Sequence, residues 1–404
     1  MNRIFPTLIS AAFLAACASP VSPEPALPEP VTAAEPAVVD WPVPDTHCAS
    51  DSVLLDAYFE TGNLGLCTVE PDGSFTLKLV PEDRPPINPS AWYAFRASGE
   101  AGEIVHVTLV MDHGYARYWP KTSPDGEHWT RLDESAVSGG GQRSKEMTFS
   151  FTLESEQTWV AGQEILDSGD YADWLEALDA VEDVDVSLLA PSQEGRPVYI
   201  AETPERPEFI LMIGRQHPPE VTGAIGMKSF LDTVFSDSEL ALRFRERFKL
   251  GVVPLMNPDG LARGHWRHSV GDKDMNRDWG PFDLPETQAV MRWVEDLEER
   301  GHELKLVMDF HSTWEDLFYT PPIVEDPLDF SSAWLNASRE RLPDFPFKHV
   351  PSTNLDQPNS KNYFYRSRGI PAITYESGDE TDRDAIRTAA VVFAEELMRE
   401  MLAR

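Results

Sequence analysis

The chain has 404 residues, which is more than one hydrophobic core usually organises, so its length favours two domains. It carries 68 Asp and Glu against 34 Lys and Arg, a formal net charge of -34. So acidic a chain repels phosphate backbones and anionic lipid head groups, and nucleic acid is not expected as a partner. Its apolar content of 41% is enough for packed cores and excludes a protein that is disordered throughout.

The N-terminal residues have the layout of a bacterial export signal. A basic start is followed by an apolar run from Ile4 to Ala16 that is too short to span a bilayer permanently. The tetrapeptide that ends at Cys17 resembles a lipoprotein signal, in which cleavage exposes the cysteine for lipidation; an ordinary cleaved signal with a chance cysteine is the alternative. Because Ala18 follows instead of Asp, residues 1–17 predict a lipid anchor at Cys17 on the periplasmic face of the outer membrane.

Residues 18–46 are rich in Pro, Ala, Val and Glu. This composition stays extended and buries no core, so the segment is predicted to be a tether. Cys48 and Cys67 are the two cysteines of the exported body. In an oxidising compartment such a pair can form a disulfide, and two free thiols are the alternative. Two cysteines cannot form a zinc site by themselves.

Short β-rich runs follow one another across residues 47–168. Turn signals such as Pro71-Asp72-Gly73 separate them. This pattern is typical of an antiparallel β-sandwich, which we expect to form the first domain. The expected strands are 75–80, 92–97, 104–111, 116–120, 147–153 and 158–161.

The rhythm changes after about residue 171, where apolar runs of strand length alternate with helical patterns. This alternation indicates an α/β domain over 169–404, with helices on both faces of a sheet. In such sheets the ligand site lies at the carboxyl ends of the strands. The expected strands are 209–213, 250–255, 304–310 and 370–374, and the expected helices are 221–235, 286–299, 331–341 and 382–401.

Candidate metal ligands come directly after two of these strands. His217 and Glu220 stand three residues apart, and imidazole and carboxylate are both ordinary zinc ligands. The pair alone is weak evidence, because a Glu-rich chain contains roughly one such pair by chance. His311 closes a later apolar run, and Asp309 shares its face of the strand. Two His and one Glu leave a position open for water, as a catalytic zinc requires, so one zinc ion per chain is expected.

Hydrolysis at such a centre also needs a base and a cation. Glu376 follows the expected strand 370–374 and is the candidate that accepts a proton from zinc-bound water as it attacks a carbonyl. An ordinary strand-end carboxylate is the alternative. The segment 263–277 is locally basic, which suggests an anionic ligand, although such side chains often pair with neighbouring carboxylates. Its cations are Arg263, Arg267, Lys273 and Arg277.

Six short motifs carry a resemblance to a known family. They read RQHPPE, VPLMNPDG, GHWRHS, DMNRDW, MDFHS and AITYESG, in this order between Arg215 and Gly378. Together they resemble the zinc carboxypeptidases of the carboxypeptidase A superfamily, most closely the cytosolic-carboxypeptidase-like branch. The resemblance implies a mixed sheet with helices on both faces, preceded by a β-sandwich with the sequence ETGNL at 60–64 near its start.

The resemblance also implies roles for individual residues. His217, Glu220 and His311 would bind zinc, and Glu376 would be the base. Arg267 would polarise the scissile carbonyl, and Asn276 and Arg277 would hold the substrate's terminal carboxylate. Asp274 would orient the zinc ligand His217.

Two departures from the family pattern matter. Pancreatic-type members have a mobile tyrosine well before the base, and residues 349–361 contain none, so no catalytic tyrosine is assigned. Pro219 replaces the glycine of the branch's H-P-G-E signature, which should stiffen the loop without removing a ligand.

The stretch before the base lines the pocket for the terminal side chain in relatives. Here it holds Lys361, Arg366 and Arg368, and a cation in that pocket would favour an acidic C-terminal residue. The sequence does not show which of the three faces the substrate, and Lys361 is our candidate.

The expected function is that of a zinc metallocarboxypeptidase that hydrolyses C-terminal residues, acidic ones on this pattern, from a peptide substrate. A cell-wall stem-peptide peptidase and a zinc amidohydrolase of small acyl amino acids stay open as alternatives. A non-catalytic surface-binding lipoprotein would be expected to have lost a ligand or the base, and none is lost. The sequence predicts neither the oligomeric state nor the role of the β-sandwich.

Overall fold

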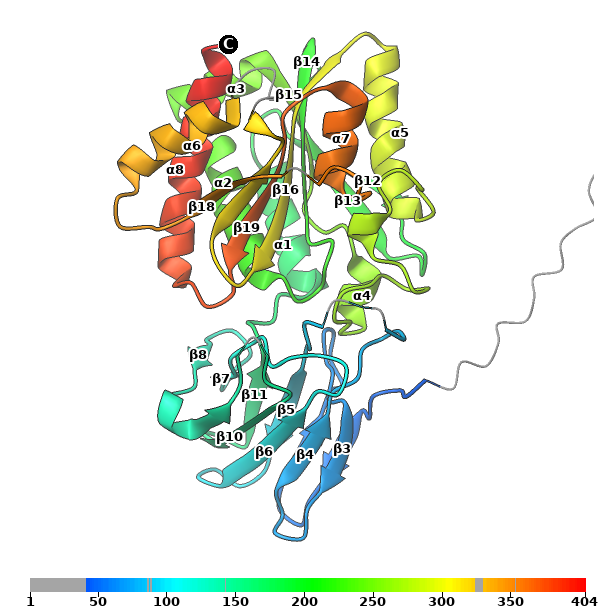
Figure 1. Ribbon diagram of the computed structural model, residues 1–404, viewed down its shortest axis with the longest axis vertical. Coiled ribbons are helices and arrows are strands. Elements are labelled where there is room, and N and C mark those ends of the chain that lie inside the picture. Colours follow the sequence, from blue (N-terminus) through cyan, green and yellow to red (C-terminus); the bar gives the residue numbers. More distant parts are fainter. Residues whose placement is uncertain (1–40, 86, 88, 142, 324–329, 353) are drawn as a thin grey trace, which may run out of the picture. The chain divides into compact units, whose positions relative to one another are not determined.

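The computed structural model describes residues 41–404 except 86, 88, 142, 324–329 and 353 (Figure 1). The expected signal at 1–17, the anchor at Cys17 and most of the tether lie outside the described residues. Where residues are described, no helix is both long and apolar enough to cross a membrane.

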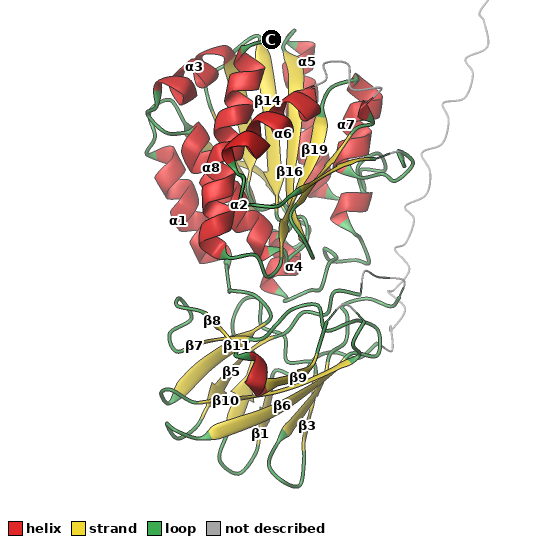
Figure 2. Ribbon diagram, turned by 60° about the vertical axis from the view of Figure 1, so that its left-hand side comes forward, coloured by secondary structure: helices red, strands yellow, loops and turns green. Residues whose placement is uncertain are grey.

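Two β-sheets form the N-terminal sandwich (Figure 2). One has six strands in the order β1-β2-β5-β11-β7-β8, all antiparallel, and the other has five in the order β3-β4-β6-β10-β9. Within the second sheet β4 and β6 run parallel, because the chain crosses through β5 of the first sheet between them. The strands are β1 His47–Ala49, β2 Leu54–Asp56, β3 Leu66–Val69, β4 Phe75–Lys78, β5 Ala94–Ser98, β6 Ile104–Val110, β7 Lys121–Ser123, β8 Thr130–Arg131, β9 Val137–Gly139, β10 Glu146–Thr152 and β11 Gln157–Ala161.

The sandwich core follows from alternation along the strands. On β6, Val105, Val107 and Leu109 are buried, and on β10 the opposing Phe149 and Met147 are buried as well. Residues between them face outward, as expected for a sheet with one covered face. The predicted β-sandwich is therefore confirmed.

The expected strand at 116–120 is wrong. Arg117 and Tyr118 are buried, yet no residue of this segment belongs to a strand, and β7 begins only at Lys121. The Arg117 side chain pairs with Asp379, and the Trp119 backbone N–H donates to the carboxylate of Glu380. The segment is thus buried against the C-terminal half of the chain and not by pairing within a sheet.

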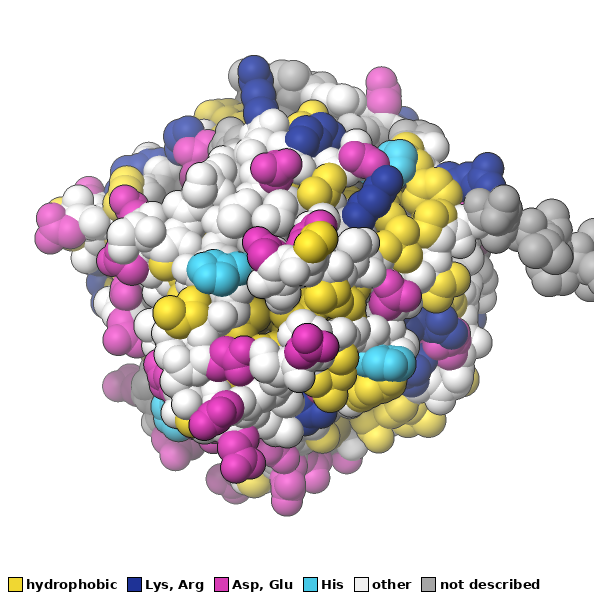
Figure 3. Space-filling view, turned by 90° about the horizontal axis from the view of Figure 1, so that it is seen from below, with side chains coloured by type: hydrophobic (Ala, Val, Ile, Leu, Met, Phe, Trp, Pro, Cys, Tyr) yellow, Lys and Arg dark blue, Asp and Glu magenta, His cyan; other side chains and the backbone are white. Residues whose placement is uncertain are grey.

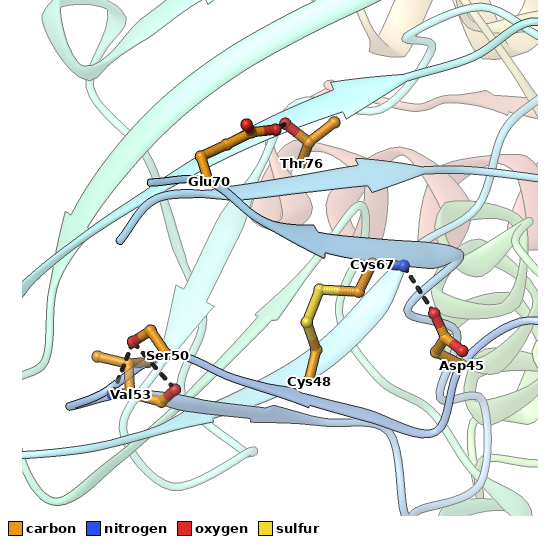
Figure 4. Close-up of a disulfide and its surroundings, with 7 residues drawn as sticks. All are labelled: Asp45, Cys48, Ser50, Val53, Cys67, Glu70 and Thr76. Atoms are coloured by element: carbon orange, nitrogen blue, oxygen red, sulfur yellow. Dashed lines mark hydrogen bonds between the residues drawn. A yellow bond between two sulfur atoms is a disulfide. The ribbon is translucent and has the colours of Figure 1, made fainter. Parts of the chain in front are cut away.

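A disulfide joins the two sheets of the sandwich (Figure 4). Cys48 on β1 and Cys67 on β3 are bonded, with their Cα atoms 6.2 Å apart. The backbone N–H of Cys67 donates to Asp45 Oδ2 at 2.8 Å, which holds the incoming chain against β3. Of the two possibilities left open by the sequence, the structure has the disulfide.

An eight-stranded mixed sheet organises the C-terminal domain, in the order β12-β13-β15-β14-β16-β19-β17-β18. The four strands β15, β14, β16 and β19 are parallel, so their carboxyl ends lie at one edge. β13 and β17 pair antiparallel with β15 and β19 on either side. The strands are β12 Asp185–Pro191, β13 Pro197–Glu202, β14 Glu208–Gly214, β15 Phe248–Val253, β16 Glu303–Thr313, β17 Leu317–Thr320, β18 Lys348–Pro351 and β19 Ala372–Gly378.

Helices cover both faces of this sheet (Figures 1 and 2). Along β14, Ile210 and Met212 belong to a core shared with α1, α2, α3, α6 and α8, whereas Leu211 and Ile213 belong to a core shared with α5 and α7. The predicted α/β fold is confirmed. The helices are α1 Ser168–Asp179, α2 Val221–Val234, α3 Glu239–Arg247, α4 Pro258–Ala262, α5 Pro285–Glu299, α6 Phe330–Arg341, α7 Ser360–Arg368 and α8 Arg383–Leu402.

Acidic side chains are dispersed over one face of the molecule. Figure 3 shows one face, on which Asp and Glu side chains are spread among apolar and basic ones. A dispersed charge of one sign keeps a protein soluble and does not by itself mark a binding site.

Candidate metal centre and active site

The loop after β14 carries the first two candidate ligands. Asn257 Nδ2 donates to the carbonyl of Gln216 at 3.0 Å, which ties this loop to the one after β15. Arg215 has a positive φ of 52°, and its Nε donates to a carbonyl three residues further on at 2.7 Å, so its side chain closes the turn. His217 lies in this turn, and Glu220 is the N-cap of α2.

Helix α2 lies directly on the strand that carries the third candidate. A Cβ at Gly223 would be 2.3 Å from the carbonyl oxygen of His311, so only glycine permits this approach. The Gly223 N–H donates to Ser312 Oγ at 2.8 Å, which satisfies one free donor of the helix N-terminus. The first turn of α2 therefore brings Glu220 to the carboxyl end of β16.

His217, Glu220 and His311 converge. Their candidate ligand atoms all lie within 4.8 Å of one another, and all three residues are buried. Glu220 Oε1 is 2.9 Å from Nδ1 of His217, and Glu220 Oε2 is 2.7 Å from Nδ1 of His311. Both imidazoles therefore turn the same ring nitrogen toward the carboxylate.

The other ring nitrogens face acidic partners. Nε2 of His217 is 3.1 Å from Asp274 Oδ1, and Nε2 of His311 is 3.0 Å from Asp309 Oδ1. Carboxylates in this position fix the tautomer of metal-bound histidines and orient their rings. Asp274 has the partner expected from the resemblance. Asp309 lies at ion-pair distance from His311, but its Oδ1 atom makes no hydrogen bond among the described residues.

This donor set fits a zinc ion. Burial alone would raise the pKa of Glu220, but the charges of His217 and His311 hold it well below its ordinary value, so the carboxylate is ionised. Two imidazoles and one carboxylate form one of the three-ligand sets of catalytic zinc sites, which keep a fourth position open. His217, Glu220 and His311 are therefore the residues that would hold the ion.

Glu376 lies beside this group. In the register of β16 and β19 it pairs with His311. Its Oε2 atom is buried and accepts no hydrogen bond from the part of the chain that the structure describes. Burial raises the pKa of Glu376 to about 7, against the opposing charge of His311. A carboxyl group of this pKa is suited to accept a proton near neutral pH.

A cavity of about 380 Å³ adjoins these residues. Eight of the nine residues predicted for the site line it, although they come from the loops or ends of several different elements; Asp274, behind His217, does not. The eight are His217, Glu220, Arg267, Asn276, Arg277, His311, Lys361 and Glu376.

The cations of the basic segment 263–277 divide into two groups. Arg263 and Lys273 pair with carboxylates and do not line the cavity. Arg267 Nε donates to Asp274 Oδ2 at 2.7 Å. Arg277 donates to a neighbouring backbone carbonyl at 2.7 Å, and within the described chain no carboxylate lies at ion-pair distance from it.

Asn276 lines the cavity, and its amide also contacts two neighbouring residues. Its Nδ2 lies 3.2 Å from Nε2 of His311, and its Oδ1 accepts the backbone N–H of Ser360 at 3.1 Å. The amide therefore links the strand end at His311 to the start of α7.

Lys361 is the cation before the base that faces the cavity. Arg368 pairs with Glu298 at 2.8 Å, and the exposed Arg366 donates to a backbone carbonyl at 3.2 Å. Lys361 is buried, donates to Asn362 Oδ1 at 2.6 Å, and has no carboxylate at ion-pair distance among the described residues. Burial lowers its pKa to about 8.

One cavity residue comes from the sandwich, and sequence reasoning missed it. Arg117 donates from Nε and Nη2 to Asp379 at 2.7 and 3.0 Å, and from Nη2 to the carbonyl of Ser312 at 2.7 Å. Asp379 follows Glu376 by three residues, and Ser312 follows His311. No local pattern could reveal Arg117, because Asp379 is 262 residues away in the chain.

Tyr319 on β17 is a second missed residue of the cavity lining. Burial, followed by the charge of Glu376, raises its pKa above the ordinary value. Two tyrosines of α7 stand closer to the base in the chain: Tyr363 packs on Phe282, and Tyr365 belongs to a hydrophobic core. Neither lines the cavity.

Comparison with known proteins agrees with this arrangement. The model of the cytosolic carboxypeptidase N-terminal domain matches residues 55–162, and the zinc carboxypeptidase model matches residues 171–322. The chain is 33% identical to human cytosolic carboxypeptidase 2 over 140 residues, which is 31% of this chain and 15% of that protein. It is 24% identical to an uncharacterized protein of Zymomonas mobilis over 269 residues, or 64% of this chain and 67% of that one.

Solved structures show the same fold. A metallo-carboxypeptidase from Burkholderia cenocepacia has a TM-score of 0.74 at 18% identity, over 87% of this chain and 99% of that one. A metallo-carboxypeptidase from Pseudomonas aeruginosa, in complex with (2-guanidinoethylmercapto)succinic acid, has a TM-score of 0.65 at 20% identity, over 86% and 98% of the two chains. With both family models matched in the expected order, the chain belongs to the zinc carboxypeptidases, in the branch of the cytosolic carboxypeptidases.

Proposed function

We propose that this protein is a zinc metallocarboxypeptidase that holds one zinc ion per chain and removes C-terminal residues from peptides. The observation that carries the proposal is the convergence of two imidazoles and a carboxylate beside Glu376, whose Oε2 atom is buried, in a cavity lined by cations. Glu376 lies beyond the residues matched by the family model, so its role rests on its geometry.

The roles follow from the positions of the side chains. A zinc ion supplies a Lewis acid that polarises a carbonyl and lowers the pKa of water. Glu376 accepts the proton of the attacking water, since its Oε2 atom has no competing hydrogen-bond donor in the described part of the chain. Arg267, held by Asp274, presents its remaining N–H groups to the carbonyl oxygen as it gains negative charge.

Arg277, with Asn276 beside it, binds the terminal carboxylate of the substrate. A free guanidinium that can bind a carboxylate through two parallel hydrogen bonds distinguishes an exopeptidase from an enzyme that cuts within a chain. The absence of a carboxylate partner for Arg277 among the described residues leaves its donors available.

We infer further that the terminal residue is acidic. A buried ammonium without an internal counterion is costly, and a substrate carboxylate would relieve that cost. Lys361 is such a group: burial is the cause of its lowered pKa, and it donates a hydrogen bond to the neutral amide of Asn362. Together Arg277 and Lys361 offer two cations to a residue with two carboxylates.

Lys361→Ala is expected to lower kcat/KM for a peptide ending in Glu by about 10- to 100-fold, as for loss of a charged hydrogen bond. For the same peptide ending in Gln the loss should stay within about 3-fold, because the neutral amide gains little from the charge. The comparison requires steady-state kinetics on this matched pair of peptides.

Arg366→Ala is the matched control, since this exposed cation of the same helix does not line the cavity. In the wild type, the preference for Glu over Gln should hold below pH 8 and decline above it, because Lys361 loses its proton there. Equal losses for the two peptides in Lys361→Ala would overturn the acidic pocket.

We also propose that the protein is a lipoprotein anchored through Cys17 at the periplasmic face of the outer membrane. The export-like N-terminus supports this location, as does a disulfide, which persists in oxidising compartments. Peptide stems of the cell wall are then an alternative substrate.

Cys17→Ala is expected to move the protein from the membrane fraction to the soluble fraction, whereas Ser19→Ala should leave it with the membrane. Immunoblots of the two fractions provide the measurement. A wild-type chain found only in the soluble fraction would contradict the anchor.

A further inference from the structure

The segment from Gly264 to His268 carries Arg267 and lies against the β-sandwich. Gly264 begins it with a φ of +62°, and a Cβ there would be 2.5 Å from the carbonyl oxygen of Gly62. Asn63 Nδ2 donates to the Gly264 carbonyl at 2.8 Å. Gly62 and Asn63 belong to the ETGNL sequence, so this stretch of the sandwich is the surface on which the segment rests.

Trp266 anchors the segment by its side chain. It is 1% exposed and is part of the sandwich's hydrophobic core, although it belongs in sequence to the catalytic domain. A Cβ at Gly114 would be 2.7 Å from the Trp266 ring, so the sandwich provides a close-fitting site for the indole.

Glu82 anchors the segment by its backbone. One Glu82 oxygen accepts the N–H of Trp266 at 2.7 Å, and the other accepts those of Arg267 and His268 at 2.9 and 2.6 Å. Asp83 adds an ion pair with His268 at 2.7 Å. Three hydrogen bonds to one carboxylate are charge-assisted and fix the direction of all three residues.

These contacts also account for the grouping of Glu82, Asp83 and His268, whose ligand atoms are close enough to hold a cation. Both oxygens of Glu82 are taken by backbone donors, and His268 and Asp83 satisfy each other. The cluster therefore acts as an anchor of the segment.

Arg267 is the member of the segment that turns toward the candidate active site. Its Nε binds Asp274 Oδ2 at 2.7 Å, and Asp274 Oδ1 contacts His217 Nε2 at 3.1 Å. A continuous set of contacts thus runs from Glu82 through the backbone of Arg267 to a candidate metal ligand.

We propose that the β-sandwich helps to form the active site by fixing the backbone that carries Arg267, and that Glu82 is a positioning residue for Arg267. The inference rests on the proposed function, in which Arg267 stabilises the charge that develops on the scissile carbonyl. A donor must lie within hydrogen-bond distance of that oxygen in the transition state, and a small displacement of its backbone removes the contact.

Glu82→Ala is expected to lower kcat and kcat/KM together by about 10- to 100-fold, since an interaction made only in the transition state is lost. In an Arg267→Ala background the same change should cost less than about 2-fold, because two residues that act as a unit are not additive. Zinc content should not change.

Asp125→Ala is the matched control. The Asp125 carboxylate also accepts backbone N–H groups within the sandwich, from Glu127 and His128, but lies outside the cavity. Its kcat should match the wild type. If Glu82→Ala does not fold, Glu82→Gln, which keeps one acceptor oxygen, replaces it in the comparison with Arg267→Ala. Its kcat is then expected to fall by about 3- to 10-fold.

Hydrogen exchange separates this inference from the proposed function. The amides of Trp266, Arg267 and His268 should exchange at least about 10-fold faster in Glu82→Ala than in the wild type, whether or not the protein cleaves peptides. Unchanged exchange, or additive losses of kcat in the double variant, would overturn the positioning role. A wild type with slow exchange and no peptidase activity would refute the proposed function and leave the anchor standing.

Discussion

Glu376→Gln is expected to lower kcat by about 10²- to 10⁴-fold while the chain keeps its zinc. The amide has nearly the same shape as the carboxylate but cannot accept the proton, and the residue is not one of the three convergent candidate ligands. Its Oε2 atom has no hydrogen-bond partner among the described residues, so the fold should tolerate the change. Peptide hydrolysis and metal content are measured on the same sample.

Glu315→Gln is the matched control for this variant. Glu315 lies near β19 in space, since a Cβ at Gly378 would be 3.3 Å from its Cα atom, but its carboxylate pairs with Lys348 at the surface. Its kcat should stay within about 2-fold of the wild type, as for most surface changes. A Glu376→Gln protein that remains fully active would remove the glutamate base from the mechanism.

Arg117→Met is expected to lower the free energy of unfolding by about 3–5 kcal/mol, the usual cost of leaving a buried charge without its partner. Asp379 is 1% exposed and receives two hydrogen bonds from Arg117, and the variant also removes the hydrogen bond from Arg117 to the carbonyl of Ser312. Urea unfolding monitored by circular dichroism measures the change.

Arg131→Met tests whether the effect depends on burial. Arg131 lies in the same domain and pairs with Glu380, the next residue after Asp379, but its side chain is 44% exposed and the pair is 3.5 Å apart. The expected loss is below about 1 kcal/mol, as for other surface pairs. Equal losses in the two variants would show that the contact of Arg117 is not a buried ion pair of ordinary strength.

The parts of the fold that local pattern determines were predictable. β14, β16 and β19 are covered on both faces and are therefore continuous apolar runs, and α2 and α8 have long helical patterns. β17 and β18 have four residues each. β17 forms by pairing with β19, and β18 by pairing with β17, so no hydrophobic pattern within either segment reveals them. The segment 116–120 was wrongly predicted to be a strand, because its side chains are buried by contacts with residues distant in the chain.

The same distinction holds for the candidate site. His217, His311 and Glu376 could be brought together from sequence because they lie in or directly after the carboxyl ends of parallel strands, which share an edge of the sheet. The sequence could not show which of the three cations before the base lines the cavity, because Arg368 instead pairs with Glu298 of α5, a helix distant in the chain. The contributions of Glu82 and Arg117 likewise depend on how the sandwich docks.

Zinc stoichiometry and release of the C-terminal residue, measured on one preparation of the purified chain, are the most direct test of the proposed peptidase. We expect about one zinc per chain and stepwise loss of the terminal residue from a peptide ending in Glu. Chelation should remove both the zinc and the activity, and adding zinc back should restore them. A chain that binds zinc yet releases no C-terminal residue, or that cuts only within peptides, would contradict the proposal.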